Sequence, residues 1–282
     1  MTTSGDINLV QALVMAALQG ITELFPVSSL GHAVILPHLL GWDIDENAPS
    51  FLPFLVMLHV GTALALLLYF WRDWWSLLSS LLPSTPRDQA TRDHQRLLLL
   101  LVLGTIPAGL LGLLLEKRLA AVFGQYRTVA VLLVLNGLLL FAGEWLRRRA
   151  RARELASLSP WQAVAIGASQ ALALLPGFSR SGASMVGGLL VGLNHQAAAR
   201  FSFLLATPII FAAALLEVPK LLAPEARSAL GPALAGGLLA GVLAYLSTAF
   251  LMRYFKGHEP NALVPFGVYC ILIGALTLVI GH

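Results

Sequence analysis

Long apolar runs separated by short polar segments dominate the chain. Two apolar stretches, 8–40 and 161–193, are too long for one membrane span and too short for two, and Pro, Gly and Ser interrupt both. Irregular backbone at membrane depth is tolerated only inside protein or beside water. We therefore expect two re-entrant helix–loop–helix hairpins. The other apolar runs approach the 20 or so residues that cross roughly 30 Å of hydrocarbon. They predict six spanning helices, at 52–71, 97–116, 128–147, 199–218, 231–252 and 264–281.

The two interrupted stretches resemble each other at an offset of about 150 residues. Four residues of the first stretch have counterparts in the second: Gln19, Pro26, Ser28 and Gly31 match Gln170, Pro176, Ser179 and Gly182. This predicts one membrane domain over 1–282, built from a first repeat (1–150) and a second repeat (151–282). One hairpin and three spans per repeat give the halves opposite orientation. The predicted fold class is an all-α integral membrane protein with an inverted-topology repeat.

Composition and charge fit this interpretation. The chain is 57% hydrophobic and 11% charged, against roughly 25% charged residues in soluble domains. The net charge of +4 does not indicate a nucleic-acid partner, because the basic residues lie in short loops between apolar runs. Most of them fall on one side, which the positive-inside rule makes cytoplasmic. Both termini and the mouth of the first hairpin then face outward, and Arg147–Arg153 meets anionic membrane lipid.

Glu23, His32 and Arg180 are ionisable residues inside the predicted hairpins. An uncompensated charge there costs at least about 2.5 to 3.5 kcal/mol on insertion scales, so such residues are candidates for function. The alternative is structural pairing across the repeat interface. His38 and His59 stand alone on apolar segments and are interpreted as packing or hydrogen-bonding residues.

The first hairpin carries residues suited to nucleophilic chemistry. Gln19 and Glu23 are four residues apart and share a helix face. Ser28 or Ser29 can cap the following half-helix, whose free N–H groups form an anion site. His32 is close enough in sequence to share a proton with Ser29, the pairing that a serine nucleophile needs. Simple N-capping is the alternative for both serines.

The second hairpin has the composition of an anion cradle. Its glycines allow close backbone approach to a ligand, and the planar guanidinium of its arginine suits phosphate oxygens. The candidate binding residues are Gly177, Ser179, Arg180, Ser181 and Ser184.

Together these motifs resemble the bacterial undecaprenyl-diphosphate phosphatases, the bacitracin-resistance family. The family's (E/Q)xxxE and PxSSxGH signature is matched by Gln19, Glu23, Pro26, Ser28, Ser29, Gly31 and His32. Its PGxSRSxxT signature is matched by Pro176, Gly177, Ser179, Arg180 and Ser181, with Ser184 where threonine is usual. Gln19 also replaces a carboxylate found in many members, so a divalent cation would find one fewer negative ligand.

The resemblance implies a bacterial inner-membrane enzyme, open to the periplasmic side, that removes the terminal phosphate of undecaprenyl diphosphate and so recycles the cell-wall lipid carrier. It implies Mg²⁺ or Ca²⁺ held by Glu23 with Gln19. We expect catalysis by Ser29, with His32 or Glu23 as base, and by Arg180; a water activated by His32 is the alternative nucleophile. Ser28, Gly177, Ser179, Ser181 and Ser184 are expected to bind the phosphates.

A transporter or flippase of polyprenyl phosphate is the rival function, because broken helices in an inverted repeat are also transporter architecture. The sequence leaves the oligomeric state open between a single chain and a homodimer.

Overall fold

Helices make up the regular structure of the described chain. The computed structural model describes residues 7–42, 44–45, 48–83, 85–86, 88–123, 125–147, 154–258 and 261–281. For residues 116–123 it describes the backbone only. The helices, in chain order, are α1 (Leu9–Thr22), α2 (Ser29–Leu39), α3 (Phe51–Tyr69), α4 (Trp71–Ser79), α5 (Gln89–Phe123), α6 (Tyr126–Arg147), α7 (Pro160–Gln170), α8 (Arg180–Leu190), α9 (His195–Glu217), α10 (Leu230–Gly257) and α11 (Val264–Ile280), with short 3₁₀ turns at Leu155–Ser157, Ala171–Leu174, Val218–Leu222 and Arg227–Ala229.

Both interrupted stretches are broken helices, as predicted. In each, the entering half-helix starts at a capping box, on Asn8 for α1 and on Ser159 for α7. Serine caps the second half-helix in both cases: Ser28 accepts from the N–H of Gly31, and Ser179 accepts from the N–H of Gly182. The residue after each cap begins the helix, and it is serine in α2 but arginine in α8.

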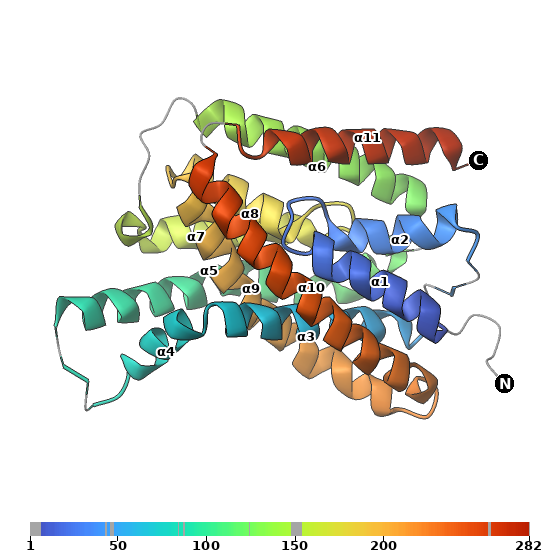
Figure 1. Cartoon of the computed structure of the whole chain (residues 1–282), viewed down its shortest axis with the longest axis horizontal. Helices are drawn as coiled ribbons and strands as arrows, with labels where there is room; N and C mark the ends of the chain where they lie inside the picture. The colour runs from blue at the N-terminus through green and yellow to red at the C-terminus, as the bar shows by residue number, and fades with distance from the viewer. Residues whose placement is uncertain are drawn as a thin grey trace.

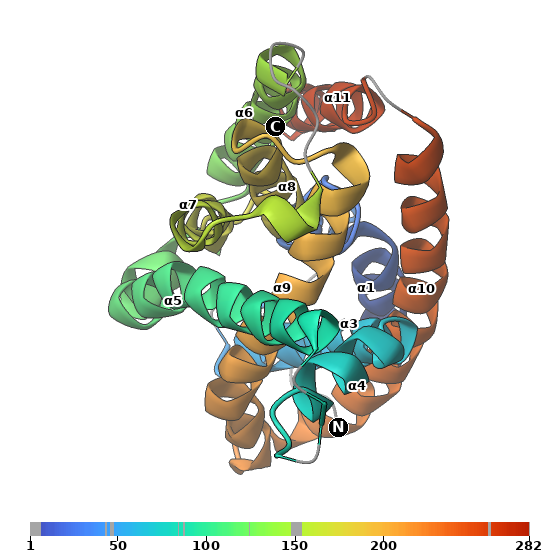
Figure 2. The same ribbon diagram turned by 90° about the vertical axis from the view of Figure 1, so that its left-hand side faces the viewer.

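The two halves of the chain interlock. α1 of the first hairpin packs on α10 from the second half, and α7 of the second hairpin packs on α5 from the first half. α6 and α11 lie side by side along one edge, while α3 and α9 cross in the interior (Figures 1 and 2). α1 begins and α11 ends at the same end of the molecule (Figure 1). Each hairpin is therefore held mainly by helices of the other half.

Among the residues that the structure describes, five helices are long and apolar enough to cross a membrane. They cover the predicted spans except 264–281, where α11 has 17 residues and falls among the shorter apolar helices. The structure also has the short helix α4, which the hydropathy pattern did not predict, and α5 begins at Gln89 rather than at 97.

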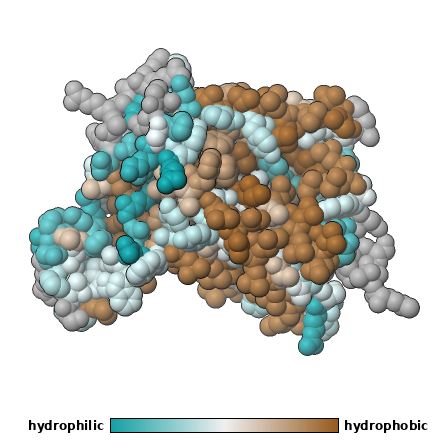
Figure 3. All heavy atoms as spheres, in the orientation of Figure 1, coloured by the Kyte–Doolittle hydropathy of each residue, from teal (hydrophilic) through white to brown (hydrophobic). Residues whose placement is uncertain are grey.

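Hydrophobic residues cover much of the face in view, while hydrophilic ones gather at one end (Figure 3). Exposed leucines such as Leu114 and Leu215, each 79% accessible, suit contact with lipid.

Glycines let the crossing helices touch. A Cβ atom on Gly167 in α7 would lie 1.9 Å from the carbonyl oxygen of Gly104 in α5. We expect Gly167→Ala to lower the melting temperature in detergent by roughly 5 °C or more, because overpacking a tight contact costs about 1 to 3 kcal/mol. Gly231→Ala, at a helical glycine with open space around it, is the control and should melt at or slightly above the wild-type temperature. Equal melting of both variants would contradict the close α5–α7 contact.

Candidate functional site

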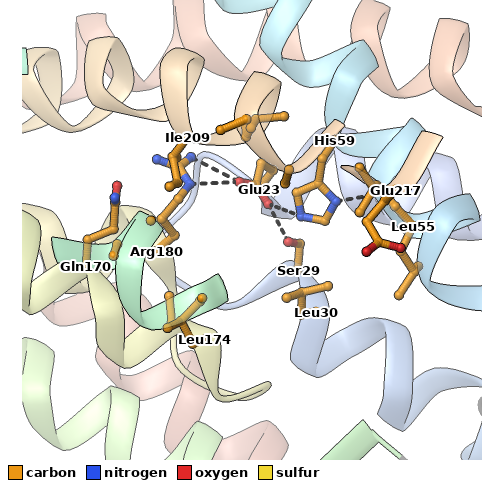
Figure 4. A pocket seen from close by; sticks show the side chains of 18 of the residues that line it. Glu23, Ser29, Leu30, Leu55, His59, Gln170, Leu174, Arg180, Ile209 and Glu217 are labelled. Atoms are coloured by element: carbon orange, nitrogen blue, oxygen red, sulfur yellow. Dashed lines mark hydrogen bonds and ion pairs between the residues drawn. The ribbon is translucent and has the colours of Figure 1, made fainter. Parts of the chain in front are cut away.

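The tips of the two hairpins contact each other and line a cavity of about 350 Å³. Most of its wall is apolar and comes from α3, α5 and α9, including Leu55, Gly112 and Ile209. The charged residues of the lining include Glu23, Arg180 and Glu217, with Ser29 and His59 beside Glu23 (Figure 4). A ligand with an anionic head and an apolar tail suits such a cavity better than a wholly polar ligand, since the walls offer few hydrogen-bond partners.

Glu23 is the hub of the site. Its Oε1 accepts hydrogen bonds from Nε and Nη2 of Arg180, at 3.2 and 3.0 Å. Its Oε2 accepts from Ser29 Oγ at 2.5 Å and from Gln19 Nε2 at 3.1 Å, and lies 3.2 Å from His59 Nε2. The carboxylate is buried, with only 4% of its side chain accessible. These neighbours compensate a negative charge that would otherwise be costly in such surroundings.

His32 does not lie where the sequence suggested. Its Nδ1 is 2.7 Å from the carbonyl oxygen of Ser28, which can only accept, so the proton sits on Nδ1. Nε2 then accepts from the hydroxyl of Tyr269, 2.8 Å away. Both ring nitrogens are therefore engaged away from Ser29, whose hydroxyl donates to Glu23 instead.

His59 is the site residue that the sequence interpretation missed. It projects from α3 toward Glu23, and its Nδ1 lies 2.8 Å from the carbonyl oxygen of Leu55. Both ring nitrogens face oxygen acceptors, an arrangement that a doubly protonated, cationic ring satisfies. Its position as a lone ionisable residue in an apolar helix was the available signal, because such residues in spanning segments mark functional sites. His38, by contrast, stacks on Tyr126 as a packing residue.

Several predicted binding residues tie the two hairpin tips together. Ser28 adopts a positive φ of 67°, unusual for a residue other than glycine, and its Oγ accepts from the N–H of Gly177 at 3.2 Å. Gly177 itself has φ 114°, and a Cβ there would lie 2.6 Å from the Cβ of Leu132. Ser181 Oγ donates to the carbonyl of Phe25 at 3.0 Å. These contacts fix the position of one hairpin tip relative to the other.

Ser179 and Ser184 differ in their relation to the cavity. Ser179 lines it, and its N–H donates to Asn136, a wholly buried residue of α6 that also donates to the carbonyl of Pro26. Ser184 lies one turn into α8 and forms hydrogen bonds with the Arg180 carbonyl and the Ser202 hydroxyl, both at 2.7 Å. Ser184 thus stabilises the start of α8. Asn136 also links the two tips by hydrogen bonds, and no local sequence motif predicted this role.

The side chains around Glu23 supply only some of the ligands that a bound metal ion needs. In the described part of the chain, no group of three or more His, Cys, Asp or Glu side chains is placed to bind a metal ion. Glu23 contributes one carboxylate, and Gln19 beside it contributes an amide. Mg²⁺ is commonly bound by one or two carboxylates, waters and substrate phosphates. The residues therefore fit an ion that arrives with a phosphate ligand.

The family described as Bacitracin resistance protein BacA matches residues 12–276, which include the second hairpin, the first hairpin from residue 12 onward and every residue that lines the cavity. The chain belongs to the BacA bacitracin-resistance family. Relatives in this BacA family include "Undecaprenyl-diphosphatase 2" of Chromobacterium violaceum, 56% identical over 96% of this chain and 98% of the relative. "Undecaprenyl-diphosphatase" of Acidiphilium cryptum is 54% identical over 95% of this chain and 96% of the relative. The resemblance stated from the motifs is confirmed.

Proposed function

We propose that this chain is an undecaprenyl-diphosphate phosphatase, which hydrolyses the terminal phosphate of undecaprenyl diphosphate to give undecaprenyl phosphate and inorganic phosphate. The observation that carries the proposal is the hydrogen bond from Ser29 Oγ to Glu23, with Arg180 on the other carboxylate oxygen, in a cavity whose lining is mostly apolar. Nucleophile, base and anion-binding group lie within one cluster, as phosphoryl transfer requires. The names of the BacA relatives specify the substrate.

The diphosphate enters with its head at the hairpin tips and its chain along the apolar wall. Arg180 turns from Glu23 to the phosphate oxygens, where its planar fork offsets the negative charge of the transition state. Glu23, released from Arg180, accepts the Ser29 proton. A Mg²⁺ or Ca²⁺ ion held by Glu23 and Gln19 would further neutralise the phosphate charge.

Ser29 Oγ bonds to the terminal phosphorus as the bond from that phosphorus to the bridging oxygen breaks. Undecaprenyl phosphate leaves with the bridging oxygen and takes the proton held by Glu23. Water then attacks the phosphoserine phosphorus while Glu23 accepts a proton from that water. The bond from phosphorus to Ser29 Oγ breaks, Ser29 Oγ takes the proton back from Glu23, and inorganic phosphate is released. His59, facing the same carboxylate oxygen as Ser29, keeps Glu23 oriented toward the hydroxyl. His32 orients the tip of α2 through Ser28 rather than acting as the base.

The assay that tests the function is phosphate release from a C55 diphosphate by the purified chain in detergent, with and without EDTA. Release that needs a divalent ion supports the hydrolase and the proposed cation together. Absence of release from well-folded wild-type protein would favour a carrier that moves polyprenyl phosphate across the membrane.

Ser29→Ala separates covalent catalysis from direct attack by water. With the covalent route we expect kcat to fall by about 10³-fold or more, because both the nucleophile and the intermediate are lost. Quenched wild-type reactions should also contain phosphoserine on the peptide that carries Ser29. Near-wild-type turnover by Ser29→Ala would rule out the covalent route and leave water as the nucleophile.

For the membrane topology, the same proposal places six spans, α11 among them, and the two hairpins in the bacterial cytoplasmic membrane. The shared end of α1 and α11 faces outward, and the hairpin site opens to that side. Arg72, Arg200 and Arg253 belong to the cytoplasmic side under the positive-inside rule. Packing of α1 on α10 and of α7 on α5 supports an inverted repeat, because equivalent helices make equivalent contacts in the two halves.

A further inference from the structure

Gln170 is a buried amide whose polar atoms have no partner. It ends α7 and is 2% accessible, and neither its Nε2 nor its Oε1 has a hydrogen-bond partner within the described part of the chain. Buried side-chain polar atoms are hydrogen-bonded in the large majority of cases, so an exception calls for an explanation. Gln170 also lines the cavity that contains Arg180 and Glu23, and Figure 4 places it across Arg180 from Glu23.

The repeat explains why this amide has no partner. In the first hairpin, Gln19 Nε2 donates to Glu23, four residues later in the chain. The counterpart of Gln19 is Gln170, and the residue four positions after it is Leu174, whose side chain cannot accept a hydrogen bond. The second hairpin has kept the amide and lost its internal acceptor.

A ligand can supply the missing acceptor. The cavity lining that the amide shares is mostly apolar and includes Leu174 and Gly112. A diphosphate head group held by Arg180 would place several charged oxygens in the same cavity, and hydrogen bonds to charged acceptors are the strong ones. We propose that the Gln170 amide donates from Nε2 to a diphosphate oxygen and positions the head group beside Arg180.

This inference rests on the proposed phosphatase function and adds a substrate-positioning residue to it. The bond forms in the bound substrate and persists in the transition state, so its loss raises KM with little change in kcat. An amide without a partner in the free protein contributes nothing to folding by hydrogen bonding. Its removal therefore leaves the melting temperature unchanged or raised.

Gln170→Met, which keeps the length of the side chain and removes its polar atoms, tests the proposal. We expect KM for the C55 diphosphate to rise about 10-fold or more, kcat to stay within about threefold of wild type, and the melting temperature to be equal or higher. Inorganic pyrophosphate should raise the melting temperature of the wild type and raise that of the variant less. Gln170→Glu, of the same shape but negatively charged, should raise KM further by repulsion.

Gln162→Met on the same helix is the matched control. That amide has partners, since it accepts from the N–H of Ser159 and donates to the carbonyl of Val191, so its loss should lower the melting temperature and leave KM unchanged. An unchanged KM in Gln170→Met, or loss of folding in that variant, overturns the inference. Wild-type protein without phosphate release would instead overturn the phosphatase proposal itself.

Discussion

Arg180→Ala is expected to reduce kcat/KM for undecaprenyl diphosphate by about 10³-fold or more. Arginines that stabilise the charge of a phosphoryl-transfer transition state contribute roughly 10³ to 10⁵ in rate. Arg180 is the guanidinium within the cavity, 3.0 Å from Glu23, and only 13% of its side chain is accessible. Arg180→Lys keeps the charge but loses the planar fork, so it should recover only part of the activity. Phosphate release at saturating and at limiting substrate concentrations gives kcat and kcat/KM for both variants.

Arg253→Ala provides the control for the loss of a positive charge. Arg253 is exposed on α10 and lies outside the cavity lining. Its replacement should leave kcat/KM within about twofold of wild type. If Arg180→Ala retains more than a tenth of wild-type kcat/KM while folding normally, the guanidinium does not bind the reacting phosphates.

Glu23→Gln is expected to lower kcat by about 10² to 10⁴-fold, the range over which general bases contribute. The amide cannot accept the Ser29 proton. It also leaves Arg180 without its buried counter-charge, and breaking such a pair costs up to about 3 to 5 kcal/mol. A lower melting temperature should therefore accompany the loss of turnover. Both quantities are measured on the same purified sample, with activity recorded well below the transition.

Glu144→Gln controls for the removal of a buried carboxylate as such. Glu144 in α6 accepts from the backbone N–H of Leu263 at 2.6 Å and lies 3.0 Å from His195 Nε2. These contacts join α6 to the start of α11 and to α9. Its replacement should lower the melting temperature but spare kcat. Comparable kcat losses in both variants would show that Glu23 acts through the fold rather than on the substrate.

The sequence predicted the broken helices because their interruptions are local. Pro26 and the serine caps are read directly from neighbouring residues, and both breaks fall where these residues predicted them. Pairing of Glu23 with Arg180 across the repeat interface was the structural alternative that the sequence offered, and the structure contains this ion pair. Both interpretations rested on the spacing of residues and on the free-energy cost of an uncompensated buried charge.

Other parts of the site depend on packing that no short motif encodes. His59 reaches Glu23 because α3 lies against α10 and α9. Its neighbours in sequence are apolar and gave no indication of a partner. The expected pairing of His32 with Ser29 relied on a separation of three residues. In the structure Ser29 turns back to Glu23 across the tip, because Ser28 takes a positive φ where the hairpin reverses.

The first residues of α2 and α8 are equivalent in the proposed repeat, yet one is Ser29 and the other is Arg180. After duplication, the two copies would have diverged at this position into a nucleophile and an anion-binding group. Neither half alone could then catalyse the reaction, because each would lack either the nucleophile or the anion-binding group. Each chain would therefore release a single equivalent of undecaprenyl phosphate in the first turnover of a rapid-quench experiment.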